Sequence, residues 1–342
     1  MTARLRTLTQ RLLLLPVLIL SAGLTARAAQ TPCEEFSRML KSTYNFKPSL
    51  LKSEAERSAK SAAMDRFWET VKSRQKEMLP CLRAALEDPK TDQWFRFDAS
   101  LLLVSLDPSR ESKAVLVRHY TSVDLDDVDL SEWVPRLAHL GAEGFDISEA
   151  AARWLAYPKA EFFLPEHGAY HVTKAEGALY LYGSMDEAQA TPALLKIASQ
   201  PSHPARELAL TYLFFQATPE ALRALKAIDT SGLPPKSRAA LVELSERPTL
   251  FEPRAQPKTS REEYLKAFND FLNGEPNTFF DIAEKVPDGE RDLVAVLKPE
   301  DLPLVRKVRR KFIAAANPHA TDYYRSFTKI LMTFVMRTET AK

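Results

Sequence analysis

The chain is poor in glycine and cysteine, with 9 glycines and 2 cysteines among its 342 residues. So little glycine leaves few of the tight turns that a many-stranded β protein needs, and no segment shows a strong strand-like alternation of apolar and polar residues. The GxSxG, P-loop and GxGxxG motifs are missing as well. The sequence therefore predicts an all-α protein and assigns no catalytic residue and no cofactor.

The chain also lacks a comfortable membrane span, because its longest apolar run, residues 12–24, is short and contains Pro16. Three arginines precede this run, and Ala26-Arg27-Ala28 follows it as a small-x-small site. This order is typical of a secretory signal peptide over residues 1–28, cleaved between Ala28 and Ala29. We expect export to the periplasm or the extracellular space, without stable membrane insertion after cleavage; an uncleaved anchor is the alternative.

The net charge of +2 gives no reason to expect a nucleic-acid partner. Residues 1–28 hold four arginines and no acidic residue, so the remaining chain has 43 basic and 45 acidic side chains. Nucleic-acid binding relies on a basic surface that neutralises phosphates. Without residues 1–28, the chain has a small net negative charge instead.

Both cysteines, Cys33 and Cys81, lie in the mature chain. Two cysteines in an oxidising compartment usually pair. We predict a Cys33–Cys81 disulfide that ties the first helix to the first hairpin, with two buried free thiols as the alternative. A metal site needs more ligands than two lone cysteines supply.

An evenly spaced pattern organises the middle of the chain. Ala178, Ala209 and Ala240 each lie in an apolar helical run, and they are 31 residues apart. Stacked helical hairpins need small residues where their backbones approach closely. Helix starts are expected at Thr191-Pro192 and Thr218-Pro219, because Thr caps free N–H groups and Pro is tolerated at the first helical position.

This period and pattern resemble bacterial HEAT-like repeats. The spacing is shorter than the ~34 residues of tetratricopeptide repeats, whose Trp/Gly/Tyr signature is also missing. The resemblance implies an α-solenoid of helical hairpins with an additional C-terminal helical region. The expected organisation is a signal peptide (1–28), an N-terminal helical region (29–90), the solenoid (91–247), a Pro-rich linker (248–259) and a C-terminal helical region (260–342).

The segment of residues 156–172 is the least repeat-like part and contains the one histidine pair worth testing. His167 and His171 have i, i+4 spacing, beside Glu166, and on a helix they would face one way and could bind zinc. Gly168 and Pro165 disfavour that helix. We therefore expect two loop histidines with ordinary hydrogen bonds and assign no metal ligand.

Two further patterns resemble functional motifs only in part. The acidic run Asp124–Asp129 departs from a calcium loop. When the loop is aligned from Asp127, position six is Glu132 instead of Gly and position twelve is Ala138 instead of Glu. Ser49-Leu-Leu-Lys52 matches the SxxK nucleophile motif, but without its SDN and KTG partners. We expect a solvated turn and a chance match.

The run Arg306–Lys311 is strongly basic, and Val305, Val308 and Phe312 would lie on the opposite, buried side of its helix. A solvated helix face is the first expectation for these cations. The alternatives are an anionic partner, or docking against the repeat region of the same chain, which is acidic.

The expected function is an exported scaffold that binds a protein or peptide along the repeats. Tyr180, Tyr182, Tyr212 and Phe215 are candidate surface aromatics, although we expect most of them to be buried between repeats. One alternative is an envelope enzyme or metal-binding protein with its site in the 156–172 loop. Another is a structural subunit of an envelope complex.

Overall fold

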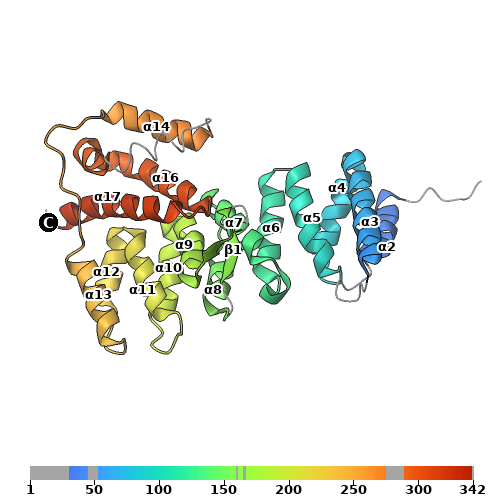
Figure 1. The fold of residues 1–342 in the computed structure, drawn as a ribbon, viewed down its shortest axis with the longest axis horizontal. Coiled ribbons are helices and arrows are strands. Elements are labelled where there is room, and N and C mark those ends of the chain that lie inside the picture. The colour runs from blue at the N-terminus through green and yellow to red at the C-terminus, as the bar shows by residue number, and fades with distance from the viewer. Residues whose placement is uncertain (1–30, 45–52, 159–160, 165–166, 275–288, 341–342) are drawn as a thin grey trace, which may run out of the picture. The chain divides into compact units, whose positions relative to one another are not determined.

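The computed structural model describes residues 31–44, 53–158, 161–164, 167–274 and 289–340, and they are predominantly helical (Figure 1). The all-α prediction is thus confirmed. The chain forms two compact units, Met1–Leu116 and Val117–Lys342, so the division falls inside one helix of the predicted repeat region. The predicted region boundaries at 90, 247 and 259 follow the sequence pattern and stay predictions.

The described residues of the first unit form four helices and the start of a fifth. Their bounds are α2 Pro32–Tyr44, α3 Glu54–Ser73, α4 Gln75–Glu87, α5 Gln93–Leu106 and α6 Arg110–Ser122, the last crossing into the second unit. The sulfur atoms of Cys33 on α2 and Cys81 on α4 lie at disulfide distance, with Cα atoms 5.1 Å apart, as predicted.

Aromatic rings form the centre of the first unit. Phe36, Tyr44, Phe67 and Phe95 are all buried, and their rings meet edge to face or tilted at centroid distances of 5.1 to 6.1 Å. Such geometries place the positive ring edges against negative ring faces. The helices α2, α3 and α5 supply these rings, so the aromatic core fixes the spacing of the three helices.

The described part of the second unit continues with helices in chain order and a short antiparallel strand pair. The elements are η2 Leu125–Asp127, α7 Leu130–Ala142, α8 Ser148–Ala156, β1 Phe162–Leu164, β2 Tyr170–Val172, α9 Lys174–Ser184, α10 Glu187–Ala198, α11 Arg206–Gln216, α12 Pro219–Ala227, α13 Pro235–Glu246, α14 Arg261–Asn273, η4 Pro299–Asp301, α16 Leu302–Ala314 and α17 Ala320–Thr340. Figure 1 shows α17 running across α9 and α11, and α16 packs against α17, α9, α7 and α14. Among the helices that the structure describes, none combines the length and the apolar character that crossing a bilayer requires.

Capping residues explain where several helices begin. Thr218 caps α12 with Pro219 as its first residue, as predicted. Ser260 forms a capping box with Glu263 at α14. The predicted start at Thr191-Pro192 is wrong. The cap is Asp186, whose side chain accepts the Ala188 N–H, and Pro192 lies inside α10.

The three alanines spaced 31 residues apart differ in burial. Ala178 on α9 and Ala209 on α11 are fully buried, as close packing requires. Ala240 on α13 is exposed, so its predicted packing role is wrong. The helix α13 contacts α11 and α12 and buries only Leu241 and Ser245.

The segment predicted as an irregular loop contains the antiparallel pair β1–β2, with Phe163 opposite His171. Phe162, Leu164 and Val172 are buried, whereas Phe163 and His171 face outward. This alternation spans only three residues in each strand. It is too short to be recognised as a strand pattern in the sequence.

Candidate functional site

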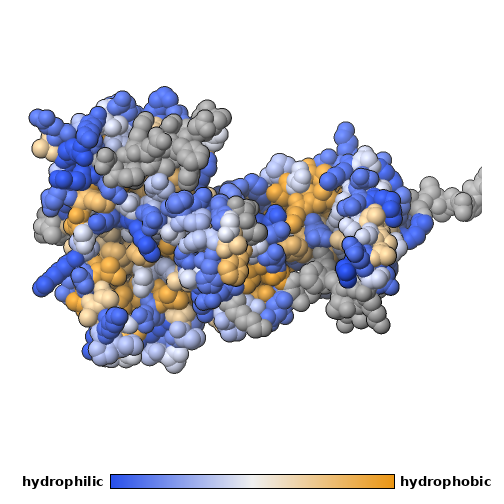
Figure 2. Space-filling model, viewed as in Figure 1, coloured by the Kyte–Doolittle hydropathy of each residue, from blue (hydrophilic) through white to orange (hydrophobic). Residues whose placement is uncertain are grey.

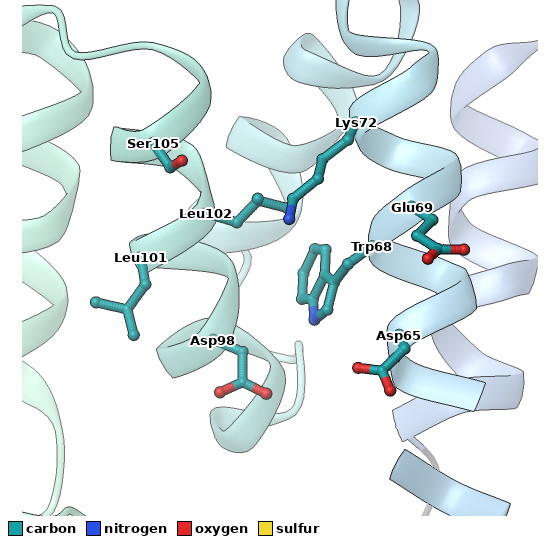
Figure 3. Close-up of a pocket in the computed structure, with 8 residues that line it drawn as sticks. All are labelled: Asp65, Trp68, Glu69, Lys72, Asp98, Leu101, Leu102 and Ser105. Carbon is teal, nitrogen blue, oxygen red and sulfur yellow. The ribbon is translucent and has the colours of Figure 1, made fainter. Parts of the chain in front are cut away.

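The first unit carries an open groove of about 580 Å³ between α3 and α5 (Figure 3). Each helix contributes four residues at the same spacing, i, i+3, i+4 and i+7, which places them along one side of a helix. The lining residues are Asp65, Trp68, Glu69 and Lys72 from α3, and Asp98, Leu101, Leu102 and Ser105 from α5. We call this feature the α3/α5 groove.

The middle of the α3/α5 groove is apolar. The Trp68 indole stands between the two helices in Figure 3, and Leu101 and Leu102 lie on the opposite wall. All three side chains are half-buried, so water reaches apolar surface here. In Figure 2, hydrophobic side chains reach the molecular surface over α5.

The aromatic core holds the Trp68 indole in place. Its ring stacks on the buried Phe95 with 5.7 Å between centroids and an interplanar angle of 17°, and it meets Phe67 edge to face at 4.6 Å. A ring that is fixed before binding loses little conformational freedom when a partner covers it. The groove floor is therefore preorganised.

Charge differs between the two ends of the α3/α5 groove. Asp65 and Asp98 lie at one end, and Lys72 extends across the other (Figure 3). The hydroxyl of Tyr44 donates to Asp98 at 3.3 Å, and burial followed by the Asp98 charge raises the pKa of Tyr44. Tyr44 is therefore a neutral donor at physiological pH, which helps hold the Asp98 carboxylate on the groove wall.

A second groove of about 740 Å³ lies beside the disulfide and is lined by Cys33 and Cys81 together with Leu40 and Tyr44. The lining also contains two lysines and two aspartates: Lys41, Lys90, Asp88 and Asp92. Because both charge signs are mixed around this groove, it indicates no particular class of partner.

The predicted basic run Arg306–Lys311 lies on α16, and its buried apolar side, Val305, Val308 and Phe312, is as predicted. The first expectation of a solvated basic face is wrong for the arginines. Arg309 is 1% exposed, and the side chains of Arg306 and Arg310 are 16% and 11% exposed.

These arginines converge on one buried carboxylate, Glu187, in the first turn of α10. Arg309 donates to Glu187 Oε1 at 2.8 Å, Arg306 donates to the same oxygen at 3.2 Å, and Arg310 donates to Oε2 at 2.6 Å. Burial raises the pKa of Glu187, but the three guanidinium charges, led by Arg309, outweigh it and leave the pKa lowered. The arginines of this run thus dock on α10 of their own chain, within residues 91–247, which is one of the alternatives that the sequence left open.

The same arginines also cap the end of α11. Arg306 donates to the carbonyl oxygens of Gln216 and Ala217 at 2.9 and 2.7 Å, and Arg309 donates to that of Phe215 at 2.8 Å. Ala217 has a φ of 52°, which ends the helix in the left-handed region. Cations at a helix C-terminus donate hydrogen bonds to the free carbonyl oxygens and interact favourably with the negative end of the helix dipole.

The candidate surface aromatics are mostly interior. Tyr180, Tyr182 and Tyr212 are buried, while Phe215 is half-buried and meets Tyr324 of α17 edge to face at 6.4 Å. The expectation that most of the four are buried is therefore confirmed, and they form no exposed aromatic surface, since α16 and α17 cover the helices that carry them.

The histidine pair does not share a helix. His171 lies on β2, where its Nε2 is 3.3 Å from Glu161 and its ring is 5.1 Å from that of Phe163, and His167 lies in the turn before the strand. Within the described residues, no group of three or more His, Cys, Asp or Glu side chains is arranged to hold a metal ion. Glu166 lies outside the described residues, as do Ser49, Lys52 and the cleavage site Ala28–Ala29.

The acidic run Asp124–Asp129 forms local turns, as expected. The Asp124 side chain accepts the Asp126 N–H at 3.1 Å and caps η2, and the Asp129 side chain accepts the Ser131 N–H at 2.9 Å and caps α7. Two of the acidic side chains thus begin helical elements.

Sequence reasoning missed the α3/α5 groove. Met64, Phe67, Trp68 and Val71 form one apolar stripe in the sequence, yet only Phe67 and Val71 are buried. A signal existed in the matched spacing of the groove residues on α3 and α5, but only the packing of these helices brings the two sets together. Comparison with protein-family models, with curated proteins and with solved structures finds no match for this chain.

Proposed function

We propose that this chain is an exported helical repeat protein of the HEAT-like kind that binds another protein, and that it does so through the α3/α5 groove. The proposal depends on one observation. The groove exposes parts of Trp68, Leu101 and Leu102 to water between charged side chains. Protein interfaces commonly combine an apolar, aromatic centre with a polar rim.

The repeat part of the proposal is supported by the order of contacts in the second unit. Helices α9, α11 and α13 begin at Lys174, Arg206 and Pro235, which are 32 and 29 residues apart, and α11 contacts both α9 and α13. In stacked helical hairpins, each repeat likewise contacts the repeats next to it in the sequence. The exposed Ala240 fits α13 as a terminal helix, since terminal repeats carry a more polar outer face.

The first unit is the better candidate for the partner surface. In the second unit, α16 and α17 cover α9, α17 also covers α11, and the Glu187–arginine cluster holds α16 there. The α3/α5 groove has no comparable cover among the described residues of its own unit, since its lining is open. Apolar surface in an open groove is a common mark of an interaction site.

Site-specific photo-cross-linking tests this proposal. A photoreactive phenylalanine analogue is placed at Leu101 in the full chain and, as a control, at the exposed position Glu243 of the second unit. We expect irradiation of the producing cells to give a discrete cross-linked adduct from position 101 and none from position 243. A folded, exported chain that gives no adduct at position 101 or at the neighbouring positions 102 and 105 contradicts the proposal.

A further inference from the structure

The shape of the α3/α5 groove indicates the kind of segment that it accommodates. Each wall spans residues i to i+7 of a helix, which corresponds to ~10 Å along the axis, or two turns. Side chains at i, i+3, i+4 and i+7 form ridges, and the space between two such ridged walls fits the ridges of a third helix. An α-helix of about three turns would cover the apolar middle of the groove.

The two walls run in the same direction. Figure 3 shows Asp65 and Asp98 at one end of the groove and Lys72 and Ser105 at the other. The acidic residue of each wall precedes the apolar residues by three or four positions, so both carboxylates meet at one end. Glu69, the third carboxylate of the lining, comes from α3 and adds to the negative charge of the groove.

From this arrangement we infer that the partner segment is an amphipathic α-helix with an apolar stripe and with Lys or Arg residues at the end that meets Asp65 and Asp98. The inference rests on the proposed function and adds the chemistry of the partner. Leu, Ile, Phe or Met side chains of the stripe contact Trp68, Leu101 and Leu102. A basic side chain at the acidic end pairs with the two carboxylates and can also lie over the indole face, which attracts cations.

Two synthetic peptides of equal length test the inference against the purified mature chain. Both carry the same leucine stripe at i, i+3, i+4 and i+7 and a fluorescent label, but one is flanked by lysines and the other by glutamates. Fluorescence anisotropy gives the affinity, and circular dichroism reports whether the bound peptide is helical. We expect the lysine peptide to bind as a helix, roughly tenfold more tightly than the glutamate peptide.

Two variants locate the binding site. Asp65 is exposed, so Asp65→Lys leaves the fold intact and should reverse the preference, weakening the lysine peptide roughly tenfold. Glu243→Lys is the matched control, because it makes the same charge change at an exposed position of the second unit. Leu101→Gln should weaken both peptides, since it removes apolar contact that both of them use.

The inference is overturned if the two peptides bind equally, if neither binds, or if Asp65→Lys acts no differently from Glu243→Lys. Should cross-linked adducts still form at position 101 in that case, the chain binds a partner of different chemistry and the proposed function stands. Absence of adducts at positions 101, 102 and 105 contradicts the proposed function itself.

Discussion

Arg309 on α16 and Glu187 on α10 are joined by a 2.8 Å hydrogen bond although 122 residues separate them, and both side chains are buried. Arg306 and Arg310 share the same carboxylate. Replacing Glu187 would leave three guanidinium groups close together without their buried counter-charge. Breaking a buried ion pair in this way is strongly destabilising.

We therefore predict that Glu187→Gln lowers the free energy of unfolding of the second unit by about 3 kcal/mol. Urea unfolding followed by circular dichroism measures the change. Glu132→Gln is the matched control, because Glu132 pairs with Arg136 on an exposed helix face, and its loss should cost less than ~1 kcal/mol. Similar small losses in the two variants would contradict a stabilising role for the buried cluster.

Acid should weaken the same cluster. The pKa of Glu187 is lowered by its arginines relative to that of the unfolded chain, so its stabilising effect is present above the unfolded value of ~4.3. That stability is lost as the pH falls through the lower folded pKa. Between pH 6 and pH 3 the wild-type chain should lose stability that Glu187→Gln cannot lose, and parallel pH profiles of the two chains would exclude this.

Asp107 provides a second pH prediction, in the first unit. The Ser112 hydroxyl, which donates to it at 2.5 Å, and then the Ser109 hydroxyl at 2.9 Å lower the pKa of Asp107 to about 2, with Arg83 adding to the effect. Its contribution to stability is present above the unfolded pKa and is lost as the pH falls from about 4 toward 2. Carboxyl carbon NMR should give the low midpoint, and Ser112→Ala should raise it, whereas Ser42→Ala, on α2, should not.

The disulfide prediction is tested chemically. Thiol labelling of the unfolded, unreduced chain should find almost no free thiol, and two labelled thiols per chain would exclude the bond. The cysteines are 48 residues apart, so the cross-link should stabilise by about 4 kcal/mol in the chain-entropy model. Cys81→Ser should lower the stability of the first unit most, because both cysteines lie in that unit.

Export is tested by sequencing the N-terminus of the protein isolated from the envelope fraction. A chain that begins at Ala29 is the expected result, because Ala26-Arg27-Ala28 precedes that residue. An intact Met1 on cytoplasmic protein would contradict both the cleavage and the export.

The histidine pair gives the last prediction. His171 is paired with Glu161 on an exposed hairpin, and His167 lies in the turn before it. His167→Ala/His171→Ala should therefore leave the fold and the adduct at position 101 unchanged. Stoichiometric zinc in the purified protein, lost together with function in the double variant, would favour the envelope-enzyme alternative.

Local chemistry made part of this structure predictable. Thr218, Ser260 and Glu263 begin their helices because a side-chain oxygen near the backbone needs no distant partner. Pro192 misled the prediction of α10, because Asp186 caps that helix five residues before the expected start. A proline one and a half turns into a helix costs one hydrogen bond, which the packing of α10 against α11 tolerates.

The sequence by itself determined the helical class, the buried side of α16 and the cysteine pair, because apolar periodicity and residue type act locally or have few alternatives. Only the tertiary structure decided that the arginines on α16 are buried and which residues line the α3/α5 groove. An arginine has the same local preferences on a solvated face as in a buried cluster, and burial depends on whether a carboxylate such as Glu187 arrives from elsewhere in the chain. Trp68 likewise faces a groove only because α5 packs beside α3, which no spacing within α3 specifies.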